Sequence, residues 1–347
     1  MPNQNNGRVL DRVLDRLAQN TTYDNFELVV VDDGSSDDSR ATLRRWRDSK
    51  RFASFELREQ EQSGAIAALN AGLDAASGEI VVQLDADASV ETSGWLERLL
   101  ELLLFDERVG VVTAKVVLDD GGLHACGVNL VGPGGFHDRP TRITERAGRR
   151  TWHQRVDRPA EGTTAEEGRL AEVDSGIGCC MAYRREDALA IGGYDRGFDP
   201  VWFDDLDLCM SIRRLGKKAF FCPDVHVLHL VRTRAGLPLG PDGLSDRARL
   251  GLRGAAGKVG SISPSARAAV ARRLGLNQPP PEHRDRLRHH YGYWQEKWGW
   301  DMLNPDMDAV HRRHGDTEVC WASDPERRAA GEQLLAGFAS VAGTAAP

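Results

Sequence analysis

Several signatures of common protein classes are scarce or missing in this chain. Its 45 Lys and Arg are outnumbered by 52 Asp and Glu, which gives a net charge of -7. General nucleic-acid binders usually carry a basic surplus, so this balance argues against that class. No run of about 18 apolar residues occurs, so we expect no transmembrane helix. No internal repeat is visible either.

The cysteines and the first residues exclude further classes. The six cysteines are scattered, and none has the spacing of a metal finger. The adjacent pair Cys179 and Cys180 suits small core packing better than a disulfide. Residues 1–6 contain no apolar core of a signal peptide. These features together favour a reduced, cytoplasmic protein.

What is present is the composition of a globular protein with an α/β pattern. Of the 347 residues 41% are hydrophobic and 28% charged, enough for one large or two ordinary domains. Short apolar runs predict strands at 26–31, 55–57, 80–84, 109–117, 219–222 and 225–229. Helical spacing predicts helices at 8–19, 64–76, 95–105, 185–191 and from about 204 to 214. This alternation is typical of a doubly wound α/β fold.

Two segments are less regular. Residues 119–172 are rich in Gly, Pro, Arg and Glu and show no sustained periodicity. A loop of that length in a compact domain is usually functional or disordered. From residue 232 onward Gly, Pro, Arg and Ala dominate, with helical patterns only near 265–275 and 283–298.

The strand at 80–84 ends in two carboxylates, Asp85 and Asp87, separated by one small residue. Side chains two positions apart on an extended segment point the same way, so both carboxylates can bind one ligand. Such a pair suits Mg²⁺ or Mn²⁺, which takes one or two carboxylates together with the oxygens of a substrate diphosphate. The alternative is that the two aspartates only start a loop or cap the next helix.

Two other acidic pairs stand at the ends of predicted elements, one after a strand and one at the start of a helix. Asp32 and Asp33 follow the strand at 26–31, where turn and capping chemistry already explains the next residues without a ligand. Asp204 and Asp205 stand at the start of a helix, where acids are favourable. Three acids within residues 204–207, directly after Trp202, exceed what capping needs.

Four blocks of sequence, in this order, resemble the inverting family 2 glycosyltransferases with the GT-A fold. The blocks are Val30–Asp37, Gly64 through Asn70 to Asp87, Gly192–Asp195, and Phe203–Leu208 with Arg213, Gly216, Pro223 and His229. The resemblance covers most of residues 8–230. It implies a Rossmann-like α/β fold with a mixed, mostly parallel central sheet flanked by helices. It divides the chain into a GT-A domain at 1–230 and a helical C-terminal extension at 231–347.

The resemblance also implies roles for the acidic residues. Asp87 and Asp85 would hold the metal and the donor diphosphate, with His229 completing the metal site from the far end of the domain. Asp205 would be the general base that takes the proton of the acceptor hydroxyl, with Asp204 beside it raising its pKa. A lone histidine is often structural, so the role of His229 stays open.

The remaining donor contacts would come from Asp32, Asp33, Gly64, Asn70 and Trp202. The two aspartates resemble those that read the nucleobase, and Trp202 belongs either to the core or against a sugar face. Residues 1–118 would form the nucleotide-sugar-binding half and residues 119–230 the acceptor-binding half.

The expected reaction moves a sugar from a UDP-, dTDP- or GDP-linked donor to a hydroxyl of a glycan or glycolipid, with Mn²⁺ or Mg²⁺ as cofactor. We expect a role in cell-surface polysaccharide synthesis, no nucleic-acid partner, and a location in the cytoplasm or at the inner face of the membrane. One rival is a nucleotidyltransferase, for which no Gly-rich basic loop is apparent. Another is a nucleotide-sugar-binding scaffold that has lost turnover.

Two departures from the family pattern favour the scaffold. Leu69 stands where many relatives carry an arginine that assists the diphosphate. Only residues 1–7 precede the first helix, so the usual opening strand, which ends in Pro-x-Tyr-Asn, is expected to be missing. That strand would lie between those at 26–31 and 80–84, so we predict a gap or an improvised edge there.

Overall fold

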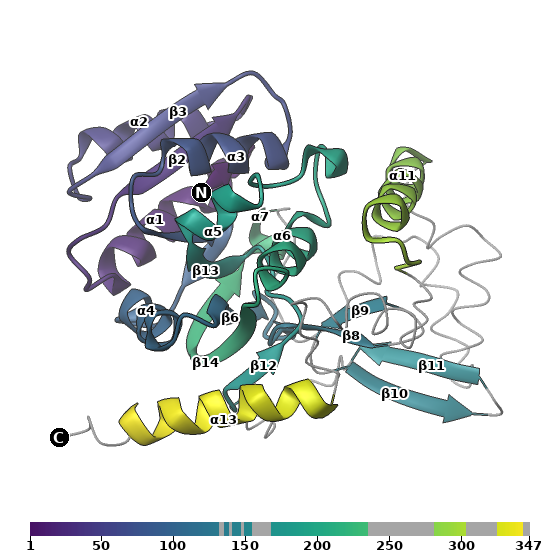
Figure 1. Cartoon of the computed structure of the whole chain (residues 1–347). Helices are drawn as coiled ribbons and strands as arrows, with labels where there is room; N and C mark the ends of the chain where they lie inside the picture. The colour runs from purple at the N-terminus through teal and green to yellow at the C-terminus, as the bar shows by residue number, and fades with distance from the viewer. Residues whose placement is uncertain are drawn as a thin grey trace, which may run out of the picture.

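The computed structural model of the protein describes residues 1–131, 135–138, 141–146, 149–154, 168–234, 281–302 and 325–342. These residues form an α/β structure in which helices flank two central sheets (Figure 1). The α/β class predicted from the alternating pattern is therefore confirmed.

The N-terminal part is a three-stranded parallel sheet with helices between its strands. The strands are β1 (Pro2–Asn3), β2 (Leu28–Asp33) and β3 (Phe55–Gln60), in that order across the sheet. The helices are α1 (Gly7–Asn20), α2 (Ser39–Asp48) and α3 (Ala65–Ala75). Helix α1 confirms the helix predicted at 8–19, because Val9, Val13 and Leu17 share one face and are buried.

The second sheet has seven strands among the described residues. They are β4 (Ile80–Leu84), β5 (Ala88–Val90), β6 (Val109–Leu118), β7 (Leu123–Ala125), β12 (Ala171–Val173), β13 (Cys180–Arg184) and β14 (Lys218–His229). The order is β12-β14-β6-β13-β4, with β5 on β14 and β7 on β6. Only β14 and β6 pair in parallel, so this sheet is mixed and largely antiparallel.

Segment 119–172, for which the sequence shows no periodicity, contributes further strands. Beyond β7 and β12 it contains two antiparallel pairs, β8 (Val128–Val131) with β9 (Gly135–Asp138) and β10 (Thr141–Arg146) with β11 (Arg149–Gln154). Short strands such as these offer too few positions for an alternating pattern to stand out.

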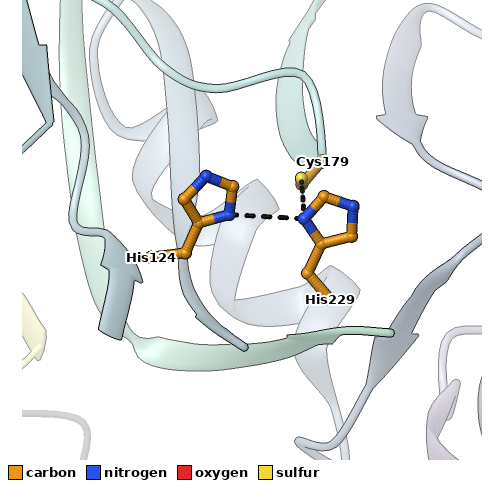
Figure 2. A group of neighbouring side chains, drawn as sticks. All are labelled: His124, Cys179 and His229. Carbon is orange, nitrogen blue, oxygen red and sulfur yellow. Dashed lines mark hydrogen bonds between the residues drawn. The ribbon is translucent and has the colours of Figure 1, made fainter. Parts of the chain in front are cut away.

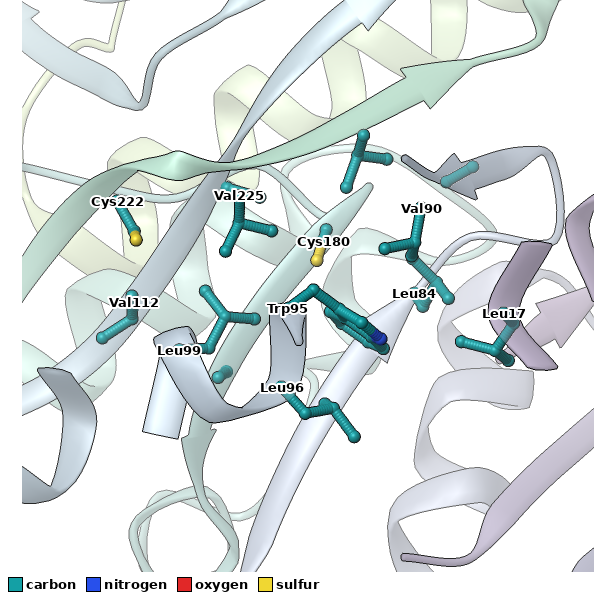
Figure 3. Close-up of a cluster of buried hydrophobic side chains, with 14 of the residues drawn as sticks. Leu17, Leu84, Val90, Trp95, Leu96, Leu99, Val112, Cys180, Cys222 and Val225 are labelled. Carbon is teal, nitrogen blue, oxygen red and sulfur yellow. The ribbon is translucent and has the colours of Figure 1, made fainter. Parts of the chain in front are cut away.

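The main core lies between helix α4 (Trp95–Phe105) and the second sheet. Trp95 and Leu99 of α4 pack over Val112 of β6 and Cys180 of β13 (Figure 3). Cys180 faces this core, whereas its neighbour Cys179 belongs to a different apolar cluster. Both are free thiols, which confirms packing in preference to a disulfide.

The remaining helices are α5 (Arg185–Ala190), the 3₁₀ turn η1 (Arg196–Phe198), α6 (Asp204–Arg213), α7 (Val231–Arg234), α11 (Pro281–Trp298) and α13 (Pro325–Ala342). Helix α11 confirms the pattern near 283–298; the pattern near 265–275 lies outside the described residues. Lys297 of α11 binds the carboxylates of Asp195 and Asp207 at 2.5 and 2.8 Å. Helix α11 thereby fixes α6, the helix that carries Asp204 and Asp205.

Strand β1 corrects the expectation that the opening strand is missing. Pro2 and Asn3 pair in parallel with Val31 and Asp32 of β2, so the end of that strand is present. Pro2 and Asn5 even have the spacing of the expected Pro-x-Tyr-Asn end, with Gln4 in place of the tyrosine. Two residues of strand are too few for any periodicity to reveal them.

The predicted gap does lie between β2 and β4. Strands β2 and β4 belong to different sheets, and a cavity of about 690 Å³ is lined by residues of both strands and by Met1. The Met1 ammonium group donates a hydrogen bond to the Val29 carbonyl at 2.9 Å. Burial lowers the pKa of this ammonium group to about 6. We call this cavity the strand slot.

Filling the strand slot should stabilise the protein. We expect that about five β-branched apolar residues fused ahead of Met1 raise the melting temperature by several degrees over a Gly-Ser segment of equal length. The physical reasons are the burial of apolar surface, at roughly 25 cal/mol per Å², and the loss of a buried ammonium group. Equal melting of the two fusions in a thermal scan would show that the slot does not accept a strand.

Candidate functional site

The three predicted metal ligands meet at the end of β4. Asp85 and Asp87 follow β4 directly, and His229, the last residue of β14, pairs with Ala88 of β5. One ligand atom each from Asp85, Asp87 and His229 lie within 4.8 Å of one another. His229 Nε2 is 3.3 Å from Asp87 Oδ1. The strand pairing therefore brings together residues that are far apart in sequence.

The charges at this point are unevenly distributed. Burial alone would raise the pKa of Asp87, but the hydrogen bond and charge of His229 and the charge of Arg234 hold it below its ordinary value. Arg234 Nε lies 3.2 Å from Asp87 Oδ2. Burial, and then the charge of Asp87, raise the pKa of Asp85 to about 7. A divalent cation beside both carboxylates would favour their ionised forms, so the donor set fits the predicted metal.

His229 has a second set of neighbours on its other ring nitrogen. Its Nδ1 lies 3.3 Å from both Cys179 Sγ and His124 Nδ1, and the two imidazole rings are nearly parallel (Figure 2). Burial, and then the charge of His229, lower the pKa of His124 to about 4, so this imidazole is neutral at physiological pH. Like Arg234, His124 and Cys179 are site residues that the sequence patterns did not single out.

Asp204 and Asp205 directly follow a turn with an unusual backbone conformation. Trp202 and Phe203, just before α6, have φ values of +83° and +66°, a left-handed conformation that residues with side chains rarely adopt. Such strain is found mainly at functional sites. The carboxylate of Asp205 accepts hydrogen bonds from the backbone N–H groups of Gly178 at 2.9 Å and Leu206 at 2.8 Å.

The two acids of this pair are in different electrostatic states. Burial, and then the charge of Asp205, raise the pKa of Asp204 to about 8. Burial also raises the pKa of Asp205, but its two backbone donors and the helix N-terminus oppose the shift.

These shifts predict how the metal-free protein responds to pH. Asp85 and Asp204 keep their protons in the folded state up to about pH 7 and 8, whereas the unfolded chain releases them near pH 4. Folding stability should therefore fall as pH rises from about 4 to 8, by at most about 1.4 kcal/mol per pH unit for each retained proton. Asp204→Asn should flatten this slope in urea titrations, whereas Asp224→Asn, at an exposed position on β14, should not.

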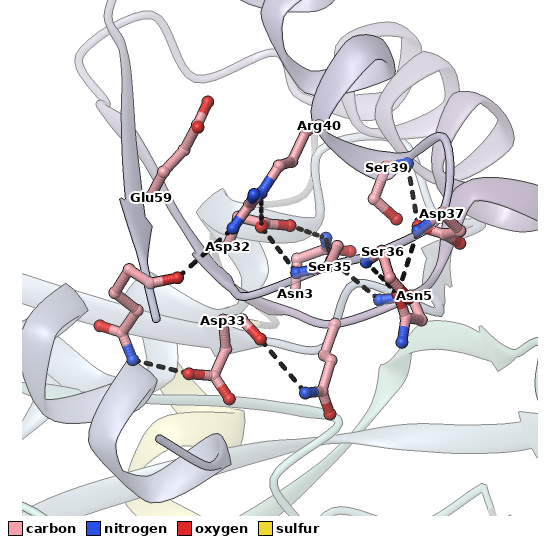
Figure 4. A network of polar contacts seen from close by, with 12 residues as sticks. Asn3, Asn5, Asp32, Asp33, Ser35, Ser36, Asp37, Ser39, Arg40 and Glu59 are labelled. Carbon is pink, nitrogen blue, oxygen red and sulfur yellow. Dashed lines mark hydrogen bonds and ion pairs between the residues drawn. The ribbon is translucent and has the colours of Figure 1, made fainter. Parts of the chain in front are cut away.

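The carboxylate of Asp32 is held by the polar network at the end of β1 and β2 (Figure 4). It is fully buried and accepts hydrogen bonds from Asn3 Nδ2 at 2.8 Å, Ser35 N–H at 3.0 Å and Arg40 Nε at 2.8 Å. The strand that was expected to be missing thus supplies one of its partners. These contacts give Asp32 a structural role in joining β1, β2 and α2. Its role in binding the nucleobase stays a prediction.

Asp33 holds the loop that leads into α3. Its two oxygens accept hydrogen bonds from Gln60 Nε2, Ser63 N–H and Gly64 N–H at 2.7–2.8 Å. Gly64 has φ of +100°, and a Cβ there would come within 2.5 Å of Pro200. Glycine is therefore required at this position by close packing, independently of any donor.

Asn70 and Trp202 also have partners within the protein. The Asn70 side chain donates to the carbonyl of Tyr194 at 2.8 Å and accepts from its N–H at 2.9 Å, which joins α3 to the 192–195 block. The Arg286 guanidinium lies 5.3 Å from the centre of the Trp202 ring, a distance typical of a cation–π contact. Their roles as donor contacts remain predictions.

The comparisons with known proteins identify the family of the chain. The profile described as Glycosyl transferase family 2 matches residues 1–190, more than half of the 347 residues. The chain therefore belongs to glycosyl transferase family 2. Its α/β architecture, with helices flanking two sheets, agrees with the GT-A fold that the sequence resemblance implied, except that the second sheet is largely antiparallel and not mostly parallel.

Two curated relatives and one solved structure illustrate the similarity. An uncharacterized glycosyltransferase of Nostoc sp. is 36% identical over 120 residues, which are 34% of this chain and 35% of that protein. The O-antigen biosynthesis protein RfbC of Myxococcus xanthus is 26% identical over 223 residues, 64% of this chain and 16% of that protein. The chain thus spans only about a third or less of the length of these relatives.

The solved structure is that of the mannosyltransferase PcManGT from Pyrobaculum calidifontis in complex with GDP-Man and Mn²⁺. It is 22% identical, with a TM-score of 0.47, and the alignment covers 98% of this chain and 78% of that one. Among the described residues of the present chain, no helix is both long enough and apolar enough to cross a membrane.

Proposed function

We propose that the protein is a metal-dependent, inverting glycosyltransferase that moves a sugar from a nucleoside diphosphate sugar to an acceptor hydroxyl. The observation that carries this proposal is the convergence of Asp85, Asp87 and His229 beside Asp205. A single loop links them. The Gly178 N–H donates to Asp205, and the carbonyl of the following residue, Cys179, accepts from the Asp85 N–H at 3.2 Å. Family membership supports the same reaction class.

Mn²⁺ or Mg²⁺ fits the donor set because two carboxylates and one imidazole suit a hard or borderline divalent cation. Bound there, the cation would act as a Lewis acid for the charge that develops on the leaving diphosphate. Asp87 and Asp85 would hold it, and His229 would complete the set. Arg234, 3.2 Å from Asp87, adds positive charge on the same side of the site.

Asp205 would supply the base. As its carboxylate takes the acceptor proton, the acceptor oxygen bonds to the anomeric carbon and the bond from that carbon to the diphosphate breaks. This single displacement inverts the anomeric configuration and releases the nucleoside diphosphate. Gly178 and Leu206 hold the carboxylate in place through their N–H groups, so the base is oriented before the acceptor arrives.

The proposed donor is linked to UDP, dTDP or GDP, and the proposed acceptor is a glycan or glycolipid. The similarity to an O-antigen biosynthesis protein supports a role in cell-surface polysaccharide synthesis. The proposed location is the cytoplasm or the inner face of the membrane. We assign the nucleotide-sugar half to residues 1–118, acceptor binding to residues 119–230, and a helical extension to residues 231–347.

A panel of UDP-, dTDP- and GDP-sugars tests this proposal. The correct donor should raise the melting temperature only when Mn²⁺ is present; at a donor concentration of 100 Kd, binding stabilises the folded state by about 2.7 kcal/mol. The matching nucleoside monophosphate is the control, because it lacks the diphosphate that the metal would bind. If no donor in the panel stabilises the protein in the presence of Mn²⁺, the proposal is wrong.

A nucleotide-sugar-binding scaffold without turnover is the second candidate. The observation that favours it is that His229 and Arg234 already neutralise Asp87 in the absence of a cation. Such a protein would bind the donor and leave it intact. Release of nucleoside diphosphate from the donor, dependent on Mn²⁺, distinguishes the two functions, because only the transferase should show it.

A further inference from the structure

We propose that His124, Cys179 and His229 form a second cation site, for Zn²⁺ or another thiophilic divalent ion, next to the Asp85–Asp87 site. One ligand atom of each residue lies within 4.8 Å of the others. The three come from β7, from the loop before β13 and from the end of β14, so the fold alone brings them together. His229 belongs to both sites, with Nε2 towards Asp87 and Nδ1 towards Cys179 and His124.

The distances suit tetrahedral coordination. Zn–N bonds of about 2.0–2.1 Å and Zn–S bonds of about 2.3 Å require N···N separations of about 3.4 Å and N···S separations of about 3.6 Å. The observed separations from His229 Nδ1 are 3.3 Å to His124 Nδ1 and 3.3 Å to Cys179 Sγ. These two separations are within a few tenths of an ångström of the tetrahedral values, and the ligand atoms of all three residues lie within 4.8 Å of one another. Three of the four positions would thus come from the protein and the fourth from water.

The hydrogen bonds of these three side chains do not all lie within the cluster, because Cys179 also has the Asp85 carboxylate as a partner. A ring nitrogen has one lone pair or one N–H, and either lies in a single direction in the ring plane. His229 Nδ1 nevertheless has two polar atoms at 3.3 Å, and it can form a well-directed hydrogen bond with only one of them. A cation at the centre would engage all three lone pairs at once, with the Cys179 proton released to solvent as the metal–sulfur bond forms.

The two neighbouring sites would select different ions. Thiolate and imidazole ligands favour Zn²⁺, whereas paired carboxylates favour Mg²⁺ and Mn²⁺. A neutral imidazole has one lone pair, so a cation on His229 Nδ1 leaves the ring proton on Nε2, towards Asp87, and takes the imidazole out of the Asp85–Asp87 site. Loss of this ligand predicts that Zn²⁺ in the second site weakens Mn²⁺ binding by about tenfold or more, a coupling of ordinary size. The proposed site is thus an inhibitory one.

Cobalt(II), added to the full chain, provides the direct test because it reports its ligands in its absorption spectrum. We expect a near-ultraviolet thiolate-to-cobalt charge-transfer band that Zn²⁺ abolishes by competition. Cys179→Ala and His124→Ala should each lose the band. His124 is partly exposed, so we expect the His124→Ala variant to fold normally, and it is the control for misfolding of the cysteine variant.

Matched controls separate this site from its neighbours. Cys180→Ala changes the adjacent thiol, which faces the α4 core, and His226→Ala changes an exposed histidine on the same strand as His229. Both should keep the band, as should Asp87→Asn, because the amide oxygen can still accept a hydrogen bond from His229 Nε2. The proposal is overturned by absence of the band in the unmodified protein, by its persistence in Cys179→Ala, or by Mn²⁺ affinity that Zn²⁺ leaves unchanged. None of these readouts depends on sugar transfer.

Discussion

The Asp205→Asn variant is expected to bind the donor with unchanged affinity and to transfer sugar about 10²–10⁴ times more slowly. Asparagine keeps the shape of the side chain but cannot take a proton from the acceptor. Its amide oxygen can still accept the hydrogen bond of the Gly178 N–H, so the loop that also contacts Asp85 should stay in place. Calorimetry with donor and Mn²⁺, combined with single-turnover transfer rates, separates binding from chemistry.

Asp204→Asn is the matched control for this prediction. Because its pKa is raised to about 8, Asp204 is already protonated near neutral pH, and the amide resembles its native state. We expect a small effect on transfer at pH 7 and a larger one only above pH 8. A normal rate for Asp205→Asn together with a large loss for Asp204→Asn would exchange the two roles.

The strands and helices that the sequence predicted well are those whose burial pattern is long and simple. The strand predicted from residue 80 is found as β4, because a run of four apolar residues, interrupted only by Gln83, ends sharply at Asp85. Helix α4 likewise spans the predicted 95–105, since its buried and exposed residues alternate at helical spacing. In such segments a local pattern and the tertiary environment demand the same structure.

Prediction failed where partners distant in sequence determine the structure. Strand β1 exists only because Pro2 and Asn3 pair with β2 and because Asn3 donates to the buried Asp32. The strands between residues 119 and 172 likewise depend on pairing, as in the match of Ala125 with Val116 of β6. Neither leaves a periodic pattern in the sequence.

The residues of the candidate site likewise fall into those that a local pattern predicts and those that it does not. Asp85, Asp87, Asp204 and Asp205 were predicted because each pair stands at the end of a strand or the start of a helix. His124, Cys179 and Arg234 were not predicted as site residues because each is isolated in the sequence. They come close to the site only through the pairing of β14 with β5 and β6. Family resemblance supplied His229, which no local pattern would have selected.

The second large effect is expected for Asp87→Ala, which should abolish Mn²⁺-dependent binding of the donor. Asp87 is buried at the end of β4, and its low pKa keeps it charged, so it is the strongest anionic ligand available to a cation at this point. Without it, Asp85 remains as a single carboxylate whose pKa is near neutrality, and His229 loses its acceptor. The cation site would then have too little negative charge to hold a hard divalent ion.

The fold should survive this substitution. The Asp87 carbonyl, which accepts the Leu230 N–H at 2.8 Å, is unaffected by removal of the side chain, and Arg234 is partly exposed and can turn to solvent. Asp224→Ala, at an exposed position on β14, is the control for the loss of one negative charge. Calorimetric titration with donor, with and without Mn²⁺, should show metal-dependent affinity in the control and none in Asp87→Ala. Because His124 and Cys179 are untouched, the cobalt–thiolate band should remain, which would show that only the carboxylate site has been lost. Unchanged Mn²⁺ dependence in Asp87→Ala would remove this residue from the metal site and leave the carboxylate pair without its proposed function.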